Sequence, residues 1–182
     1  MIGKLKTFLR RFSGDTGGSV AVEAAVILPV LLWAMVAMWV FFDAYRTRST
    51  TEKAAFTISD MLSRETNAID DAYLDGAKNL LDLLARSDSA SGLRVTVISY
   101  SGANKSHALE WSKTRGNMQA MDGSAMNQIV GDLPTMSDGE TMILVETLST
   151  YEPALKVGLG DQVIKTFVFT RPRFAPQLVW ES

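Results

Sequence analysis

The feature that most constrains this chain is an uncharged, mostly apolar run of nineteen residues, from Ala24 to Phe42. As an α-helix rising about 1.5 Å per residue, the run would reach roughly 28 Å, close to the ~30 Å thickness of a bilayer's hydrocarbon core. One carboxylate, Glu23, stands directly before it. The sequence therefore predicts a transmembrane helix over residues 19–43, with a single acidic side chain at its entrance.

Length and composition limit what the rest of the chain can do. The 139 residues that follow position 43 suit one domain with a modest core. The net charge of −2 gives no indication of nucleic-acid binding. The chain has no cysteine, which excludes disulfides, thiolate metal sites and a cysteine nucleophile. It has one histidine, His107, so metal sites built on several histidines are also excluded.

Residues 1–18 form a short basic leader with a net charge of +3, from Lys4, Lys6, Arg10, Arg11 and Asp15. The leader holds four Lys and Arg residues and residues 44–60 hold three, which favours a cytoplasmic N-terminus. A short N-terminal arm is also easier to leave in the cytoplasm than a whole domain is to retain there. We therefore expect residues 44–182 to form one α+β domain on the far side of the membrane.

The leader and the apolar run could instead be a cleaved secretory signal peptide. The run is longer than the apolar region of a usual signal peptide, and the segment Phe41–Tyr45 offers no small-x-small cleavage site. Both features favour a retained anchor.

Two helices are expected before any strand. No proline or glycine occurs between Val30 and Asp75, so the first helix can continue past the membrane through apolar residues spaced by four and three, namely Ala54, Ile58 and Met61. The signals for the start of a second helix are Asn67, Asp70 and Asp71. Its apolar stripe would comprise Ile69, Tyr73, Ala77, Leu80, Leu81 and Leu84.

From Leu93 the pattern changes to runs rich in β-branched and apolar residues. The predicted strands are Leu93–Ser101, Ala108–Thr114, Thr141–Tyr151 and Val163–Arg171, with a short helix at Asp122–Val130. Helices followed by strands predict an α+β fold with a small, mainly antiparallel sheet.

The start of the apolar segment resembles a known family. Residues Gly18–Glu23 read G-S-V-A-V-E and the next seven read A-A-V-I-L-P-V, which is similar to the N-terminal segment of the TadE/TadG-like proteins. These are minor pseudopilins of the tight-adherence (Flp-type) pilus assembly system. In that family a prepilin peptidase cuts after the glycine, and a glutamate is the fifth residue of the mature chain. Here Gly18 matches the glycine, Ser19 would be the first mature residue, and Glu23 is the fifth by count.

The proline of the family's hydrophobic segment is matched by Pro29, whereas Ala24 stands where an aromatic residue often follows the glutamate. The resemblance implies a pilin-like fold, processing at Gly18 and Ser19, and an assembly role for Glu23. It implies membrane lipid, a prepilin peptidase, other pilins or pseudopilins and the pilus assembly machinery as partners, with no cofactor. It also implies a bacterial inner-membrane protein that crosses once, with a cytoplasmic N-terminus and a periplasmic C-terminal domain.

Glu23 has two possible roles on physical grounds alone. It could lie at the level of the lipid headgroups, at a helix N-terminus where the helix dipole favours an anion. It could instead be held in apolar surroundings to pair with a cation on a neighbouring chain.

Two classes of function follow. The first is a structural pseudopilin that helps to assemble a pilus. The alternative is a single-pass anchored periplasmic binding or sensory domain. An anchored hydrolase is disfavoured because no catalytic constellation accompanies His107. The N-terminus separates the first two classes, since a pseudopilin loses residues 1–18 and a sensor keeps them.

Overall fold

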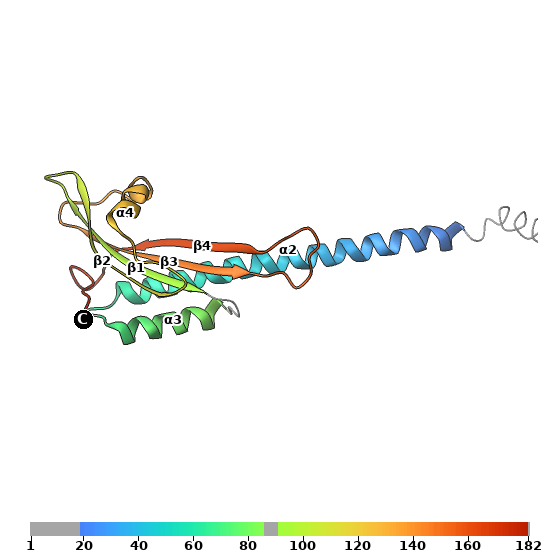
Figure 1. Ribbon diagram of the computed structural model, residues 1–182, viewed down its shortest axis with the longest axis horizontal. Coiled ribbons are helices and arrows are strands. Elements are labelled where there is room, and N and C mark those ends of the chain that lie inside the picture. The colour runs from blue at the N-terminus through green and yellow to red at the C-terminus, as the bar shows by residue number, and fades with distance from the viewer. Residues whose placement is uncertain (1–18, 86–90, 182) are drawn as a thin grey trace, which may run out of the picture. The chain divides into compact units, whose positions relative to one another are not determined.

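The computed structural model describes residues 19–85 and 91–181 (Figure 1). Its elements in chain order are α2 (Ser19–Ser63), α3 (Asp71–Ala85), β1 (Gly92–Ser101), β2 (Ser106–Gly116), α4 (Gly123–Ile129), the 3₁₀ helix η2 (Val130–Asp132), β3 (Thr141–Tyr151) and β4 (Gln162–Thr170). The strands form one four-stranded sheet of order β2-β1-β3-β4, and every neighbouring pair is antiparallel. The predicted α+β fold is therefore confirmed.

The chain divides into two structural units. One comprises the chain up to Phe42 together with Ala154–Leu159, and we call it the helix–loop unit. The other comprises Asp43–Pro153 and the chain from Gly160 on, and we call it the sheet domain. The helix α2 is continuous through Pro29 and contributes to both units.

The sheet domain begins with the C-terminal part of α2, which extends past the apolar run as the sequence predicts. Asp70 caps the start of α3, because its carboxylate accepts a hydrogen bond from the backbone N–H of Tyr73 over 2.8 Å. Ile69, expected on the stripe of this helix, lies before it in a bridge with Trp180. Both backbone groups of Ile69 form hydrogen bonds with the C-terminal segment. The N–H of Ile69 donates to the carbonyl oxygen of Val179, and the N–H of Glu181 donates to the carbonyl oxygen of Ile69, each over 2.9 Å.

Both faces of the sheet are covered in part. The C-terminal part of α2 and the whole of α3 lie on one face, as Figure 1 shows. There Ile58 and Leu81 share a core with alternate residues of the two central strands, Leu93, Val95, Val97, Ile143 and Val145. On the opposite face α4 packs Met126 against Ile98 and Leu144. The alternation of side chains along a strand explains why neighbouring residues enter different cores.

The strands β3 and β4 form a hairpin whose last paired residues are Tyr151 and Gln162. Ile164, Thr166 and Val168 on β4 are buried, whereas the alternate residues Phe167 and Phe169 are exposed. The hairpin therefore covers the helices with one face only. Its connecting segment, residues 152–161, includes Ala154–Leu159, which belongs to the helix–loop unit.

Candidate functional site

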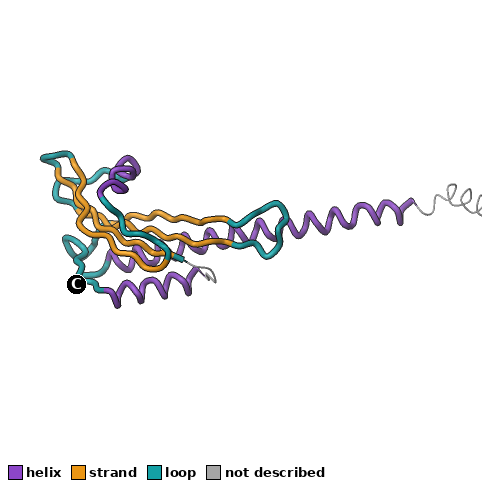
Figure 2. Tube along the Cα trace, in the orientation of Figure 1, coloured by secondary structure: helices purple, strands orange, loops and turns teal. Residues whose placement is uncertain are grey.

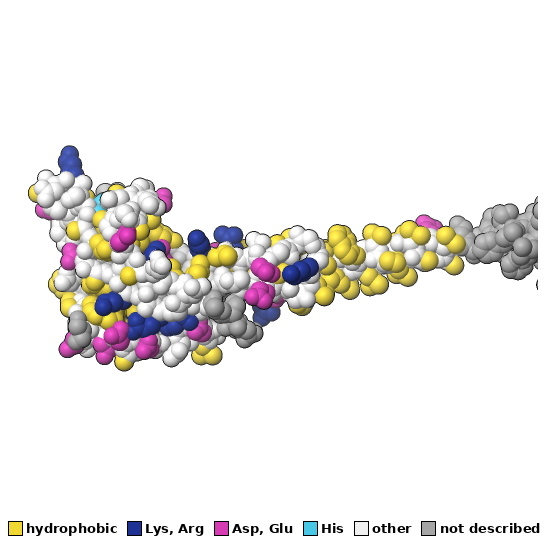
Figure 3. Space-filling model, in the orientation of Figure 1, with side chains coloured by type: hydrophobic (Ala, Val, Ile, Leu, Met, Phe, Trp, Pro, Cys, Tyr) yellow, Lys and Arg dark blue, Asp and Glu magenta, His cyan; other side chains and the backbone are white. Residues whose placement is uncertain are grey.

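The N-terminal part of α2 presents an apolar surface. Among the described residues, α2 is the one helix that is long and apolar enough to cross a membrane by length and composition. Its large side chains between Val20 and Phe42 are mostly exposed, including Val26, Leu28, Val30, Leu31, Leu32, Trp33, Met35, Met38, Trp39 and Phe41. Figure 3 shows yellow hydrophobic side chains all along this part of the helix, with white atoms between them. An apolar surface of this extent requires lipid or other apolar helices around it.

Glu23 is the one charged residue on this part of α2. Its side chain is exposed, and no residue in the described ranges forms a hydrogen bond or an ion pair with it. The next charge along the helix is Asp43, and twenty helical residues place the two about 30 Å apart. A lone carboxylate on an apolar helix is available to a partner outside this chain.

The two residues expected at a processing site lie at the edge of the described chain. Gly18 is outside the described residues, and α2 is described from Ser19 on. Glu23 follows Ser19 by four residues on the same helix, so the two positions share one helix face.

At the other end of the apolar run, the structure reveals a contact that the sequence analysis missed. Tyr151, the last residue of β3, donates a hydrogen bond from its hydroxyl to Oδ2 of Asp43 over 2.9 Å. Burial, and then the nearby Asp43 carboxylate, raise the pKa of Tyr151 to about 12. The only available signal was that Asp43 is the first charge after the run.

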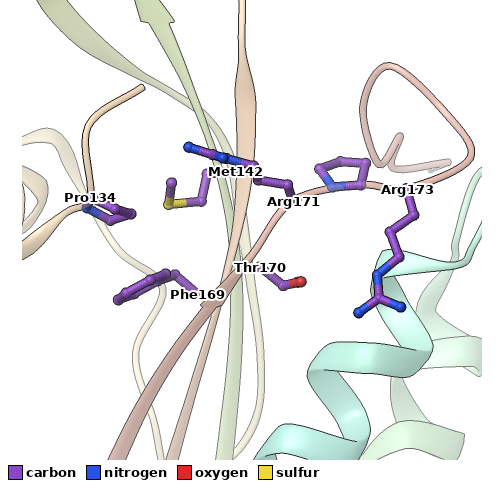
Figure 4. A pocket seen from close by; sticks show the side chains of 7 residues that line it. Pro134, Met142, Phe169, Thr170, Arg171 and Arg173 are labelled. Carbon is purple, nitrogen blue, oxygen red and sulfur yellow. The ribbon is translucent and has the colours of Figure 1, made fainter. Parts of the chain in front are cut away.

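A pocket of about 360 Å³ opens where β4 ends (Figure 4). It is lined by Pro134, Met142, Phe169, Thr170, Arg171, Pro172 and Arg173. Its volume lies at the low end of the range for small-molecule sites, which is roughly 300–1,000 Å³. The pocket is the strongest structural argument for a binding domain.

The two arginines of the pocket already have partners. Arg171 forms an ion pair with Glu140 and donates to the carbonyl oxygen of Thr135 over 3.0 Å. Arg173 forms an ion pair with Asp60 at 3.3 Å. Glu140 balances Arg171, whereas Asp60 is shared between Arg173 and Arg64, the latter at 2.9 Å, and balances Arg173 only in part.

The remaining side chains with possible chemistry are structural. His107 lies on β2 with its ring against Tyr100, at 4.9 Å between centroids. Trp111 donates from Nε1 to the carbonyl oxygen of Leu178 over 3.0 Å and packs against Trp180. Within the described ranges, no group of three or more His, Asp or Glu side chains could hold a metal ion.

Comparison with known proteins gives one match. Residues 18–59 match the family model described as TadE-like protein, so the matched segment includes Gly18, Ser19 and Glu23. No curated protein and no solved structure matches the chain. The resemblance read from the sequence is thus confirmed for the N-terminal helix, and the sheet domain lies outside the match except for residues 43–59 of α2.

Proposed function

We propose that this chain, which has a TadE-like segment at residues 18–59, is a minor pseudopilin that takes part in assembly of a tight-adherence (Flp-type) pilus. The observation that carries the proposal is Glu23, which is exposed, has no partner among the described residues and is the one charge on residues 19–42 of α2. The role is structural rather than catalytic. Membrane lipid, other pilins or pseudopilins and the assembly machinery are the partners that the proposal requires.

In this proposal residues 19–43 span the bacterial inner membrane and residues 44–182 form the periplasmic domain. The leader of net charge +3 resists passage through the bilayer and holds the N-terminus in the cytoplasm. A prepilin peptidase then cuts between Gly18 and Ser19. A periplasm-dependent reporter fused after Ser182 should therefore be active, and activity of a cytoplasm-dependent reporter alone would contradict this topology.

Cleavage gives Glu23 a possible partner. The cut creates an α-amino group on Ser19, and free α-amino groups, with pKa values of about 7.7–8.0, are mostly positive at neutral pH. Within one chain the amine lies one helical turn from Glu23. Between chains, Glu23 of one subunit can take the amine of its neighbour, which fixes the axial register as apolar helices pack together.

The pairing of Glu23 with the amine sets the axial register of the packed helices more than it strengthens their association. A buried ion pair often adds little net stability, but removing one partner leaves a buried charge at a cost of about 3–5 kcal/mol. A helix packed one turn out of register would leave each group without its partner on the neighbouring chain. Glu23 thus discriminates between registers that the uniformly apolar surface would otherwise accept equally.

The test is a count of surface pili in cells that produce Glu23→Ala. The variant should enter the membrane and be processed, yet fail to support pili, and Glu23→Asp should be intermediate. A matched control is Glu52→Ala on the same helix outside the apolar run, where the exposed pair Arg48–Glu52 is worth less than about 1 kcal/mol. Normal piliation with Glu23→Ala would contradict the assembly role and favour the other role of Glu23, a carboxylate at the level of the lipid headgroups.

The alternative is a single-pass anchored periplasmic binding or sensory domain. Its support is the pocket at the end of β4, but the arginines there are paired with Glu140 and Asp60. The binding-domain alternative also gives no role to a lone carboxylate on the helix. We therefore favour the pseudopilin.

A further inference from the structure

The loop between β3 and β4 has an alternating apolar pattern. Leu155, Val157 and Leu159 occupy every second position of Ala154–Leu159. The side chain of Leu155 is 50% exposed, and Val157 and Leu159 are half-buried. The backbone N–H of Val157 donates to the carbonyl oxygen of Leu155 over 3.1 Å, which makes a tight turn at Lys156. The turn leaves a leucine and a lysine side by side at an exposed tip.

This loop lies beside the apolar helix. Ala154–Leu159 belongs to the same structural unit as the chain up to Phe42. Figure 2 shows the loop in teal alongside α2. Its approach is fixed by the hydrogen bond from Tyr151 to Asp43, because Asp43 directly follows the last residue of the apolar run. From Tyr151 the chain continues toward the apolar residues of α2 before it returns as β4.

The charges of the loop suit the boundary between lipid and water. Lys156 is the one charged residue of Ala154–Leu159, and the carboxylates of Glu152 and Asp161 lie at the loop's base. A lysine at this boundary can bury its aliphatic stem and place its ammonium group among lipid phosphates. On α2 the exposed aromatic residues Trp39 and Tyr45 flank the end of the apolar run, where membrane interfaces favour such side chains.

We propose that Ala154–Leu159 inserts into the membrane interface as a second lipid contact beside α2. Leu155 enters the boundary between headgroups and acyl chains, and Lys156 binds anionic headgroups. The proposal rests on the membrane placement of α2 in the proposed function, and it goes further because it gives the sheet's hairpin a lipid-binding role. Burial of the exposed leucine supplies the apolar contribution, and the lysine adds attraction to anionic lipid.

The test uses the full chain, whose lack of cysteine makes every introduced cysteine unique. Three single-cysteine variants carry a nitroxide label: Leu155→Cys in the loop, Leu31→Cys in the apolar helix and Asn104→Cys in the exposed β1–β2 loop. Each is reconstituted in vesicles of phosphatidylethanolamine and phosphatidylglycerol. Collisional relaxation by oxygen, which concentrates in lipid, is compared with that by a water-soluble nickel complex.

The oxygen-to-nickel ratio at Leu155→Cys should be several-fold above that at Asn104→Cys and below that at Leu31→Cys. A ratio at Leu155→Cys equal to that at Asn104→Cys, with a lipid value at Leu31→Cys, would overturn the loop proposal and leave the proposed function intact. Water-like ratios at all three positions would show that α2 is not inserted, and both proposals would then fail.

A second variant separates the charge from the apolar contact. Lys156→Glu, combined with the label at Leu155→Cys, places an acid among the lipid phosphates. The ratio at the label should fall in vesicles with phosphatidylglycerol and change much less in vesicles of phosphatidylcholine alone. An unchanged ratio in the anionic vesicles would overturn the role given to Lys156.

Discussion

The hydroxyl of Tyr151 donates a hydrogen bond to the carboxylate of Asp43, and this bond joins the last residue of β3 to the first residue of α2 after the apolar run. The two residues are 108 positions apart in the sequence. The bond gives a partner to the carboxylate that follows the apolar run. It also fixes the point on the helix at which the β3–β4 hairpin begins its turn.

Removing this hydrogen bond should destabilise the sheet domain. Tyr151→Phe leaves the half-buried Asp43 without its donor, at a cost of roughly 1–2 kcal/mol in the free energy of unfolding. The measurement is denaturant unfolding of the full chain in detergent. Tyr45→Phe, at a tyrosine that is 74% exposed, is the control and should change little. Equal stability of the two variants would mean that the Tyr151–Asp43 bond contributes nothing.

The burial of Tyr151, together with its bond to Asp43, should be visible in an alkaline titration. Burial raises the pKa of Tyr151 and of Tyr73 to about 12, from 10.0. Because the folded protein favours the neutral phenol, the stabilising contribution is present below pH 10 and is lost as the pH rises through about 12. The absorbance of tyrosinate should therefore show a late-titrating fraction, and Tyr151→Phe should remove about half of it. A titration curve that keeps its late fraction in Tyr151→Phe would contradict this assignment.

Local patterns in the sequence were enough to predict the elements. The strand Thr141–Tyr151 has the predicted bounds, and the helix expected to continue through Met61 ends at Ser63. These signals are periodic, so they depend only on neighbouring residues. β2 extends beyond the predicted Ala108–Thr114 because its pairing with β1 runs from Ser106 to Gly116.

Contacts between distant segments were not predictable. The strand order, the bridge between Ile69 and Trp180, and the bond between Asp43 and Tyr151 each join residues that no local pattern connects. Such pairings are decided by packing of the whole domain. Glu23 could be identified because a charge beside an apolar run is itself a local signal. The apolar alternation of the β3–β4 loop is equally local, but a function for the loop could be proposed only once the structure showed that it lies beside α2.

An ion pair across the two central strands offers a test of the sheet register. Arg94 and Glu146 are directly opposite on β1 and β3, and two bonds of 2.6 Å join the guanidinium to the carboxylate. Both side chains are largely buried, at 18% and 14% exposed. Arg94→Met should lower the free energy of unfolding by roughly 2–3 kcal/mol, because it leaves the Glu146 carboxylate unpaired.

The double variant Arg94→Met with Glu146→Met is the control for this pair. It leaves no unpaired charge, so its stability should lie closer to that of the natural sequence than either single variant does. Denaturant unfolding of all four proteins gives the coupling energy. Additive effects of the two substitutions would show that the side chains do not interact as the register requires.

Gly116, which ends β2, combines a positive φ of 72° with close packing. An added Cβ would meet the carbonyl oxygen of Ser91. Gly139 has nearly the same φ, 74°, but open space around it. Gly139→Ala should therefore cost about 1–2 kcal/mol from backbone strain alone, and Gly116→Ala about 2–4 kcal/mol. Equal losses in thermal unfolding would contradict the close approach at Ser91.

The most direct test of the pseudopilin proposal is the N-terminus of the protein extracted from membranes of cells with an active prepilin peptidase. Mass spectrometry should find a chain that begins Ser-Val-Ala-Val-Glu at Ser19, with a formal charge of −5 instead of −2 because the leader of +3 is gone. Gly18→Val should block the cut and keep the leader on the chain. A natural-sequence protein that retains an intact Met1 in those cells would contradict the proposal and favour an anchored binding or sensory domain.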